Sequence, residues 1–156
     1  MKVRYFLRFI LLVILLNVIR YVVGMPLEML FIFDGLMGTM ADNASYFNAN
    51  FTTLDWITSY CYNFMMWLTC VWIFDRMHPA FTGSWMAKSL KIFSMTWLFF
   101  VSVSAIYMNH YSHSKMFYLY NIGDSLIVFT LVAIANGFLY PKLMLKNKIS
   151  TYFIIV

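Results

Sequence analysis

Residues 117–140 read FYLYNIGDSLIVFTLVAIANGFLY, an apolar run that holds one charged residue, Asp124. About 20 residues of α-helix cross the hydrocarbon core of a bilayer, which is roughly 30 Å thick. The run is at least that long, and it does not alternate between apolar and polar residues as a strand of a membrane barrel would. It therefore predicts a transmembrane helix.

Three further apolar runs predict spans of the same kind, at residues 5–25, 56–74 and 92–108. Pro26 lacks the backbone N–H that a helix interior uses, so we expect the first helix to kink there or to end near Gly24. Pro141 is expected to close the last run. The fold class that follows is an all-α membrane protein, a four-transmembrane-helix antiparallel bundle that forms a single integral membrane domain over residues 1–156.

The composition supports the same class of protein. The chain is 63% hydrophobic and 11% charged, with a mean hydropathy of +0.76, which is outside the usual balance of a soluble domain. The net charge is +5, but the basic residues fall mostly at the ends of the apolar runs, where they can meet anionic headgroups. We therefore expect these charges to face the lipid bilayer, and no nucleic acid as a partner.

The distribution of Lys and Arg predicts how the chain is oriented. The outer loop, residues 34–55, has neither, whereas basic residues gather at the N-terminus, in the cytoplasmic loop at 75–91 and in the tail at 141–156. Basic residues mark the cytoplasmic side of a membrane protein. We predict a multi-pass protein of the inner (plasma) membrane with both termini in the cytoplasm.

Arg20 and Asp124 place opposite charges inside two predicted spans, at similar depths below the outer surface. We expect the two to pair, because either charge alone would carry a large desolvation cost. One interpretation is an internal clasp that fixes helix register; the other is a polar pocket open to the outer face, in which Arg20 binds an anionic or carbonyl group and Asp124 exchanges protons. The candidate cluster or ligand site comprises Asn17, Arg20, Glu28, Asn63, Asn121 and Asp124.

Few residues suggest a metal or a reaction. His110 and His113 are three positions apart and are the candidate metal ligands, but two histidines in a polar connection are usually only solvated, so no metal is predicted. No histidine lies inside a predicted span, which argues against haem held by axial histidines, and no cofactor is predicted. The chain has no G-x-S-x-G or H-E-x-x-H sequence, so no catalytic residue is assigned and an enzyme is not favoured.

The chain combines a polar first loop, the turn Thr82-Gly83-Ser84 in a basic connection, and a last helix that runs from Gly123-Asp124 to Gly137. In this layout it resembles small uncharacterised bacterial four-helix inner-membrane proteins. The resemblance implies a similar bundle and location, and it implies no activity.

Short loops leave little surface outside the membrane for catalysis. The sequence therefore favours a non-enzymatic accessory or interaction subunit of a larger membrane complex, with a membrane-protein partner or further copies of itself, and with the apolar tail at residues 149–156 as a docking segment. A small carrier or a lipid- or ligand-binding protein that uses the outer-leaflet polar pocket is the alternative. An immunity-type protein against a membrane toxin comes third.

Overall fold

The computed structural model describes residues 2–42, 50–110 and 114–145, and in these ranges the chain forms helices and no strand. Two short irregular turns, the π-helical η1 and the 3-10 η3, continue longer helices. The elements in chain order are α1 (Lys2–Ile19), η1 (Arg20–Gly24), α2 (Met25–Phe31), α3 (Phe33–Ala41), α4 (Thr53–Met77), η3 (His78–Ala80), α5 (Trp85–His110) and α6 (Lys115–Met144).

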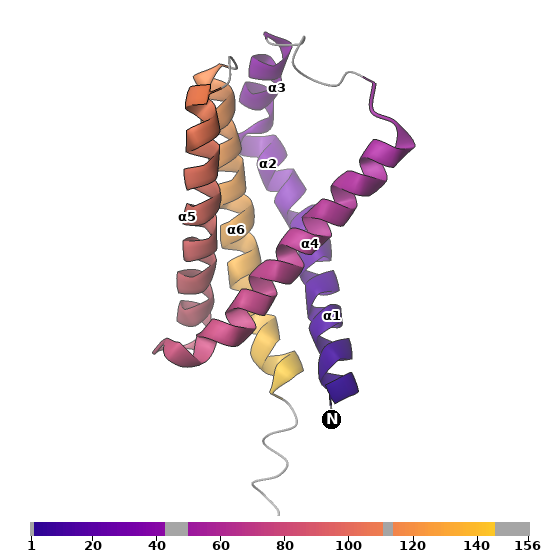
Figure 1. Ribbon diagram of the computed structural model, residues 1–156, viewed down its shortest axis with the longest axis vertical. Coiled ribbons are helices and arrows are strands. Elements are labelled where there is room, and N and C mark those ends of the chain that lie inside the picture. The colour runs from indigo at the N-terminus through magenta and orange to yellow at the C-terminus, as the bar shows by residue number, and fades with distance from the viewer. Residues whose placement is uncertain (1, 43–49, 111–113, 146–156) are drawn as a thin grey trace, which may run out of the picture.

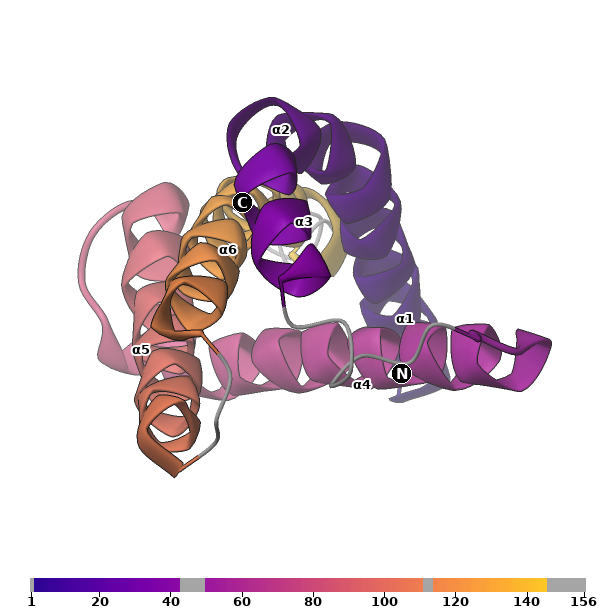
Figure 2. The same cartoon turned by 90° about the horizontal axis from the view of Figure 1, so that it is seen from above.

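Helix α6 lies at the centre of the arrangement. Helix α5 packs along it on one side, and α1 and α3 contact it on the other (Figure 1). Helix α4 begins away from the other helices, crosses them obliquely and ends beside α5, to which η3 and a short turn join it (Figure 1). The view from above shows α4 along one side of the molecule (Figure 2). The bundle is therefore closed at one end and open at the other, where α4 leaves it.

The buried core lies at the closed end, where α1, α4, α5 and α6 meet. Trp67 and Phe74 of α4 are fully buried there. Trp67 packs on Phe129 of α6, with ring centroids 5.0 Å apart. The remaining members of the core are mostly aliphatic: Phe9, Leu12, Val13, Leu16, Cys70, Val71, Ile92, Phe93, Val128, Val132, Ala133 and Tyr140.

The backbones of α5 and α6 approach each other closely. A Cβ atom added to Gly137 would lie 2.9 Å from Cα of Met86, so only glycine fits at this contact. Ser89 donates a hydrogen bond to the carbonyl of Ala133 (2.7 Å), and Asn136 donates one to the Ser89 hydroxyl (3.0 Å). Small and polar residues at such contacts are typical of helices that associate inside membranes.

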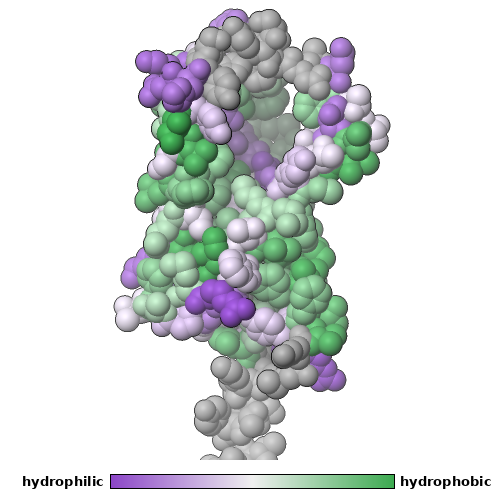
Figure 3. Space-filling model, viewed as in Figure 1, coloured by the Kyte–Doolittle hydropathy of each residue, from purple (hydrophilic) through white to green (hydrophobic). Residues whose placement is uncertain are grey.

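Three helical segments are long and apolar enough to cross a membrane: Val3–Phe31, Trp85–His110 and Lys115–Met144. Large apolar side chains remain exposed on them, including Phe99 and Phe138. The space-filling view shows apolar surface over the middle of one face and hydrophilic side chains towards its two ends (Figure 3). This is the distribution expected of a protein surrounded by lipid, and it supports association with a membrane.

The count of four spans is not confirmed. The predicted span at residues 56–74 forms the middle of α4, but α4 does not reach the hydropathy of the three segments above. The reason is its composition, because Thr58, Ser59, Tyr60, Tyr62 and Asn63 lower the mean hydropathy of its first half.

The first span differs from the prediction at Pro26. The helix neither ends at Gly24 nor stops at the proline, because η1 adds a wider turn in which the Met25 N–H donates to the Arg20 carbonyl. Pro26 then lies in the first turn of α2, where a missing N–H costs little. The helical segment continues to Phe31, six residues beyond the predicted end at residue 25.

The predicted loops are shorter than expected. The outer loop at 34–55 contains most of α3 and the start of α4, and helices also extend into the cytoplasmic loop at 75–91. Pro141 does not close α6, which continues to Met144, since a proline so near a helix end removes only one hydrogen bond. The docking segment at residues 149–156 lies outside the described residues.

A capping box fixes the start of α4. The Thr52 hydroxyl accepts from the Asp55 N–H (3.3 Å), while the Thr52 hydroxyl and N–H donate to Asp55 Oδ2 (2.6 and 2.8 Å). The side-chain hydrogen bond from Thr52, and then its backbone hydrogen bond, hold the pKa of Asp55 below its ordinary value. The carboxylate therefore stays charged at the positive end of the helix dipole, where a negative charge is favourable.

Candidate functional site

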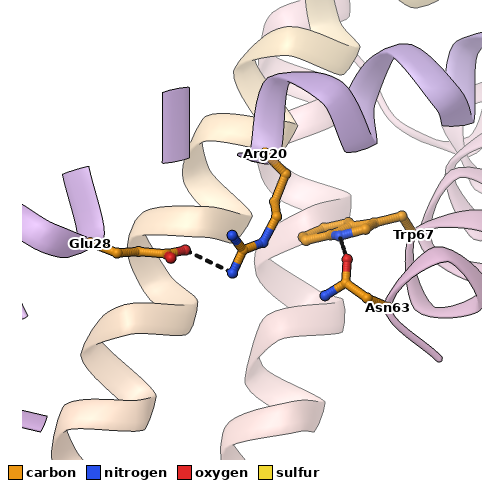
Figure 4. A network of polar contacts seen from close by, with 4 residues as sticks. All are labelled: Arg20, Glu28, Asn63 and Trp67. Carbon is orange, nitrogen blue, oxygen red and sulfur yellow. Dashed lines mark hydrogen bonds and ion pairs between the residues drawn. The ribbon is translucent and has the colours of Figure 1, made fainter. Parts of the chain in front are cut away.

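Arg20 forms an ion pair with Glu28, and its guanidinium Nη2 lies 2.9 Å from the Glu28 carboxylate. Figure 4 shows Arg20 reaching toward Glu28, with Trp67 and Asn63 on its other side. Both charged side chains are largely buried, with 16% and 15% of their surfaces exposed. The guanidinium also lies over the ring of Tyr21, 4.7 Å from its centroid. The positive charge is therefore compensated within a single helical segment.

The π-helical turn η1 makes this pairing possible. Eight residues of regular α-helix would rotate Glu28 by about 80° relative to Arg20, at 100° per residue. A π turn inserts about one extra residue, so the offset falls to roughly 20° and both side chains point to one face. The local irregularity thus determines which carboxylate Arg20 meets.

Asp124 is not the partner that the sequence analysis expected. Among the described residues Arg20 makes its ion pair with Glu28, while Asp124 lies within electrostatic range of both Arg20 and Glu28. The expected pairing is wrong, because η1 brings Glu28 onto the face of Arg20 and the ion pair forms within the first helical segment. The structure nevertheless brings the three charged candidates together between α6 and the first helical segment.

The three candidate asparagines do not complete the hydrogen bonds of these charges. Asn17 donates to the Val13 carbonyl, and Asn121 donates to the Phe117 carbonyl, each at 2.9 Å within its own helix. The Asn63 carbonyl oxygen accepts from Trp67 Nε1 at 3.0 Å. Of the six candidates, the three charged residues therefore lie together, whereas each asparagine makes its hydrogen bond within its own helix.

One donor of the cluster stays unused. Arg20 Nε is buried and has no hydrogen-bond partner among the described residues. Two grooves lie on the molecule, one between α4 and α5 and a smaller one between α1 and α4, and neither is lined by Arg20, Glu28 or Asp124. The smaller groove is lined by one of the candidates, Asn17. The choice between a clasp and a polar pocket stays a prediction.

A second polar cluster, which the sequence analysis missed, joins three helices at the closed end of the bundle. The hydroxyls of Tyr5 (α1) and Tyr140 (α6) both donate to Oδ1 of Asp75 (α4). Next to it, His78 Nδ1 lies 2.9 Å from the Asp75 carbonyl, and Trp85 packs on Tyr140 with centroids 5.5 Å apart. The Asp75 carboxylate thus accepts from the buried Tyr140 and from the partly exposed Tyr5, and these hydrogen bonds connect α1, α4 and α6.

No local signal would have revealed this cluster. Asp75 directly precedes Arg76 at the end of an apolar run, where a charged pair normally meets water or headgroups. Its partners lie 70 and 65 positions away in sequence, so only the packing of the helices brings them to it.

The histidine hypothesis is tested only in part. His110 ends α5, whereas His113 lies outside the described residues. Within the described ranges no group of three or more His, Cys, Asp or Glu side chains could hold a metal ion.

No protein family model, no curated protein and no solved structure matches the chain. The resemblance to small four-helix inner-membrane proteins therefore rests on layout alone, and function has to be argued from the contacts described above.

Proposed function

We propose that the chain is a non-enzymatic, four-span protein of the inner (plasma) membrane, with both termini in the cytoplasm. In this proposal it acts as an accessory subunit of a larger membrane complex. The outer half of α4, residues 53–63, binds one transmembrane helix of the partner protein.

Length and charge support a crossing by α4. Its 25 residues extend over about 37 Å at 1.5 Å per residue, enough to cross the core even when tilted. Residues 34–55 before it contain no Lys or Arg, while Arg76 stands in its last turn. This asymmetry agrees with an outer start and a cytoplasmic end, and hence with cytoplasmic termini.

The docking role is based on the exposure of the outer half of α4. Tyr62 is 74% exposed and Leu54 68% exposed, because α4 has left the bundle at this point. Hydroxyl-bearing residues on this half make it a poor surface for lipid, whereas such residues commonly bind neighbouring helices in membranes. The Thr58 hydroxyl already donates to the Leu54 carbonyl within α4 (2.9 Å), and a partner helix would offer an acceptor to the exposed Tyr62 hydroxyl.

Aromatic packing already orders this surface. Phe51 packs on Trp56 (5.1 Å between centroids), Trp56 stacks on Tyr60 (6.3 Å), and Tyr60 meets Tyr21 of η1 edge to face (5.5 Å). Rigid Trp and Tyr side chains lose little entropy on binding and are enriched among the residues that dominate interface energies. The row of Trp56 and Tyr60 therefore provides the anchor for the partner.

Site-specific photo-crosslinking in native membranes tests the proposal. A benzophenone amino acid at Ile57 or Tyr62 should crosslink one fixed protein. The same probe at Leu98 of α5 or Phe138 of α6, which are 55% and 58% exposed, should crosslink lipid only. Crosslinking from all four positions to many proteins, or from none, would contradict the docking role.

A pair of variants separates specific docking from incidental capture. Trp56→Ala with Tyr60→Ala should abolish co-purification of the crosslinked partner at unchanged folded yield, whereas Leu98→Ala should retain it.

Deleting residues 149–156 tests the tail as a second contact. Uptake of a solute that is lost in Asp124→Asn and needs no partner would instead favour the carrier, and protection from a membrane toxin would favour the immunity protein.

A further inference from the structure

A long apolar groove separates α4 from α5, because the two helices diverge from the turn that joins them (Figure 1). Its volume is about 670 Å³, which lies inside the range of about 300–1,000 Å³ typical of small-molecule sites. The hydroxyls of Thr69 and Thr96 on its walls donate to the carbonyls of Met65 and Phe93 in their own helices (2.9 and 2.8 Å). The groove therefore offers hydrocarbon contacts and little to bind a polar ligand.

The wall of the groove that α5 forms is apolar along most of its length and becomes basic at the end where a turn joins α4 to α5. Ile92 and Met95 line the groove. Lys88 lies four residues before Ile92, and Lys91 lies four residues before Met95. Residues four apart share one face of a helix, so the two lysines continue the lining stripe beyond the apolar part.

The α4 wall follows the same pattern. Arg76 is exposed and lies three residues after Ile73, which lines the groove. The neighbouring carboxylate, Asp75, accepts hydrogen bonds from Tyr5 and Tyr140 and is held on the side of α1 and α6. Its charge is thus engaged elsewhere, and the basic end of the groove keeps a net positive charge.

We propose that the groove binds one molecule of an anionic phospholipid, with an acyl chain between α4 and α5 and the phosphate group at Arg76, Lys88 and Lys91. Basic side chains at the cytoplasmic end of a gap between membrane helices are suited to anionic headgroups. Trp85, whose ring lies 5.3 Å from the Lys88 ammonium, stands at the same level, as tryptophans at membrane interfaces do. A transmembrane helix would fill the apolar part but would supply no anion for the basic end.

Lipid binding at this groove goes beyond the docking role. The groove follows α4 from Tyr62 to Met77, so it shares only Tyr62 with the proposed partner surface at residues 53–63. The lipid proposal rests on a crossing of the membrane by α4, as the docking role does, but it needs no partner protein. Lipid retention can therefore fail while a crosslinked partner is still found, and the reverse.

Native mass spectrometry of the purified full-length chain, with phosphatidylglycerol or phosphatidylcholine of identical acyl chains added, tests the proposal. The wild-type chain should retain one phosphatidylglycerol more strongly than phosphatidylcholine. Lys88→Gln with Lys91→Gln should reduce this retention at least tenfold, since each basic residue near the headgroup contributes a factor of about five. Arg4→Gln with Lys142→Gln, two exposed basic residues elsewhere on the chain, is the matched control and should change it little.

A groove-filling variant, Thr96→Phe, tests the acyl-chain part separately and should lower retention of both lipids. Tryptophan fluorescence and thermal unfolding should show that all variants stay folded. Equal retention of the two lipids by the wild-type chain, or equal loss in both double variants, would overturn the proposal. Self-association that excludes lipid from the wild-type chain would also overturn it, because a second copy would then occupy the groove.

Discussion

The carboxylate of Asp75 joins three helices, so its removal should weaken the whole closed end of the bundle. Tyr140 is only 2% exposed, and a hydrogen bond to a charged acceptor contributes about 1.5–3 kcal/mol. We expect Tyr140→Phe to lower the free energy of unfolding by about 2 kcal/mol. Tyr5 is 44% exposed and water can replace its acceptor, so Tyr5→Phe should cost about 1 kcal/mol. Asp75→Ala removes both bonds and should cost about 3 kcal/mol or more.

Unfolding in mixed micelles with increasing SDS, followed by tryptophan fluorescence, measures these differences. Tyr62→Phe removes an equivalent hydroxyl from an exposed site and is the control, with an expected change below about 0.5 kcal/mol. The decisive comparison is the double variant, because Tyr140→Phe should have almost no effect once Asp75 is alanine. An equal cost of Tyr140→Phe in both backgrounds would refute the role of Asp75 in joining the three helices.

Three further outcomes follow from the described contacts. Arg20→Glu or Glu28→Arg alone should destabilise the chain by about 3 kcal/mol, and the double swap should restore most of it in the same micelle assay. Gly137→Ala should cost about 1–3 kcal/mol, because the added methyl group would force α5 from α6. Thr52→Val should raise the pKa of Asp55 toward its ordinary value. Because the pKa of Asp55 is lowered in the folded chain, the stability that the cap contributes is present at neutral pH and is lost as the carboxylate is protonated on acidification. An NMR titration of the Asp55 carboxyl should show protonation at a higher pH in the variant than in the wild-type chain.

Long apolar runs made the helices predictable. The runs at 92–108 and 117–140 became α5 and α6, each extended by a few residues beyond the limits expected from polar neighbours. The first run behaved likewise up to the point where η1 changes the register. Residues 56–74 also became helical, as the middle of α4, but their tyrosines and threonines leave this helix less apolar than the three other segments, so the fourth span stays a prediction.

The site was harder to predict because its contacts depend on small rotations and on distant packing. Arg20 and Asp124 were recognised as candidates because their charges lie inside predicted spans, Glu28 was included with them, and the structure gathers all three. The choice between the two carboxylates depended on one inserted residue in η1, for which the nearby Pro26 was the only signal. The Asp75 cluster required the relative placement of α1, α4 and α6, which no single segment encodes.

Cysteine accessibility in intact cells tests whether α4 crosses the membrane, since the four-span topology and the outer position of residues 53–63 both depend on this crossing. In a background with Cys61 and Cys70 replaced by serine, one single cysteine replaces Leu54, in the first turn of α4, and another replaces Thr82, beyond its last residue. A membrane-impermeant maleimide should label the cysteine at position 54 from outside, and label position 82 only after the membrane is opened. Labelling of both positions from the same side would show that α4 does not span, and would contradict the four-span account.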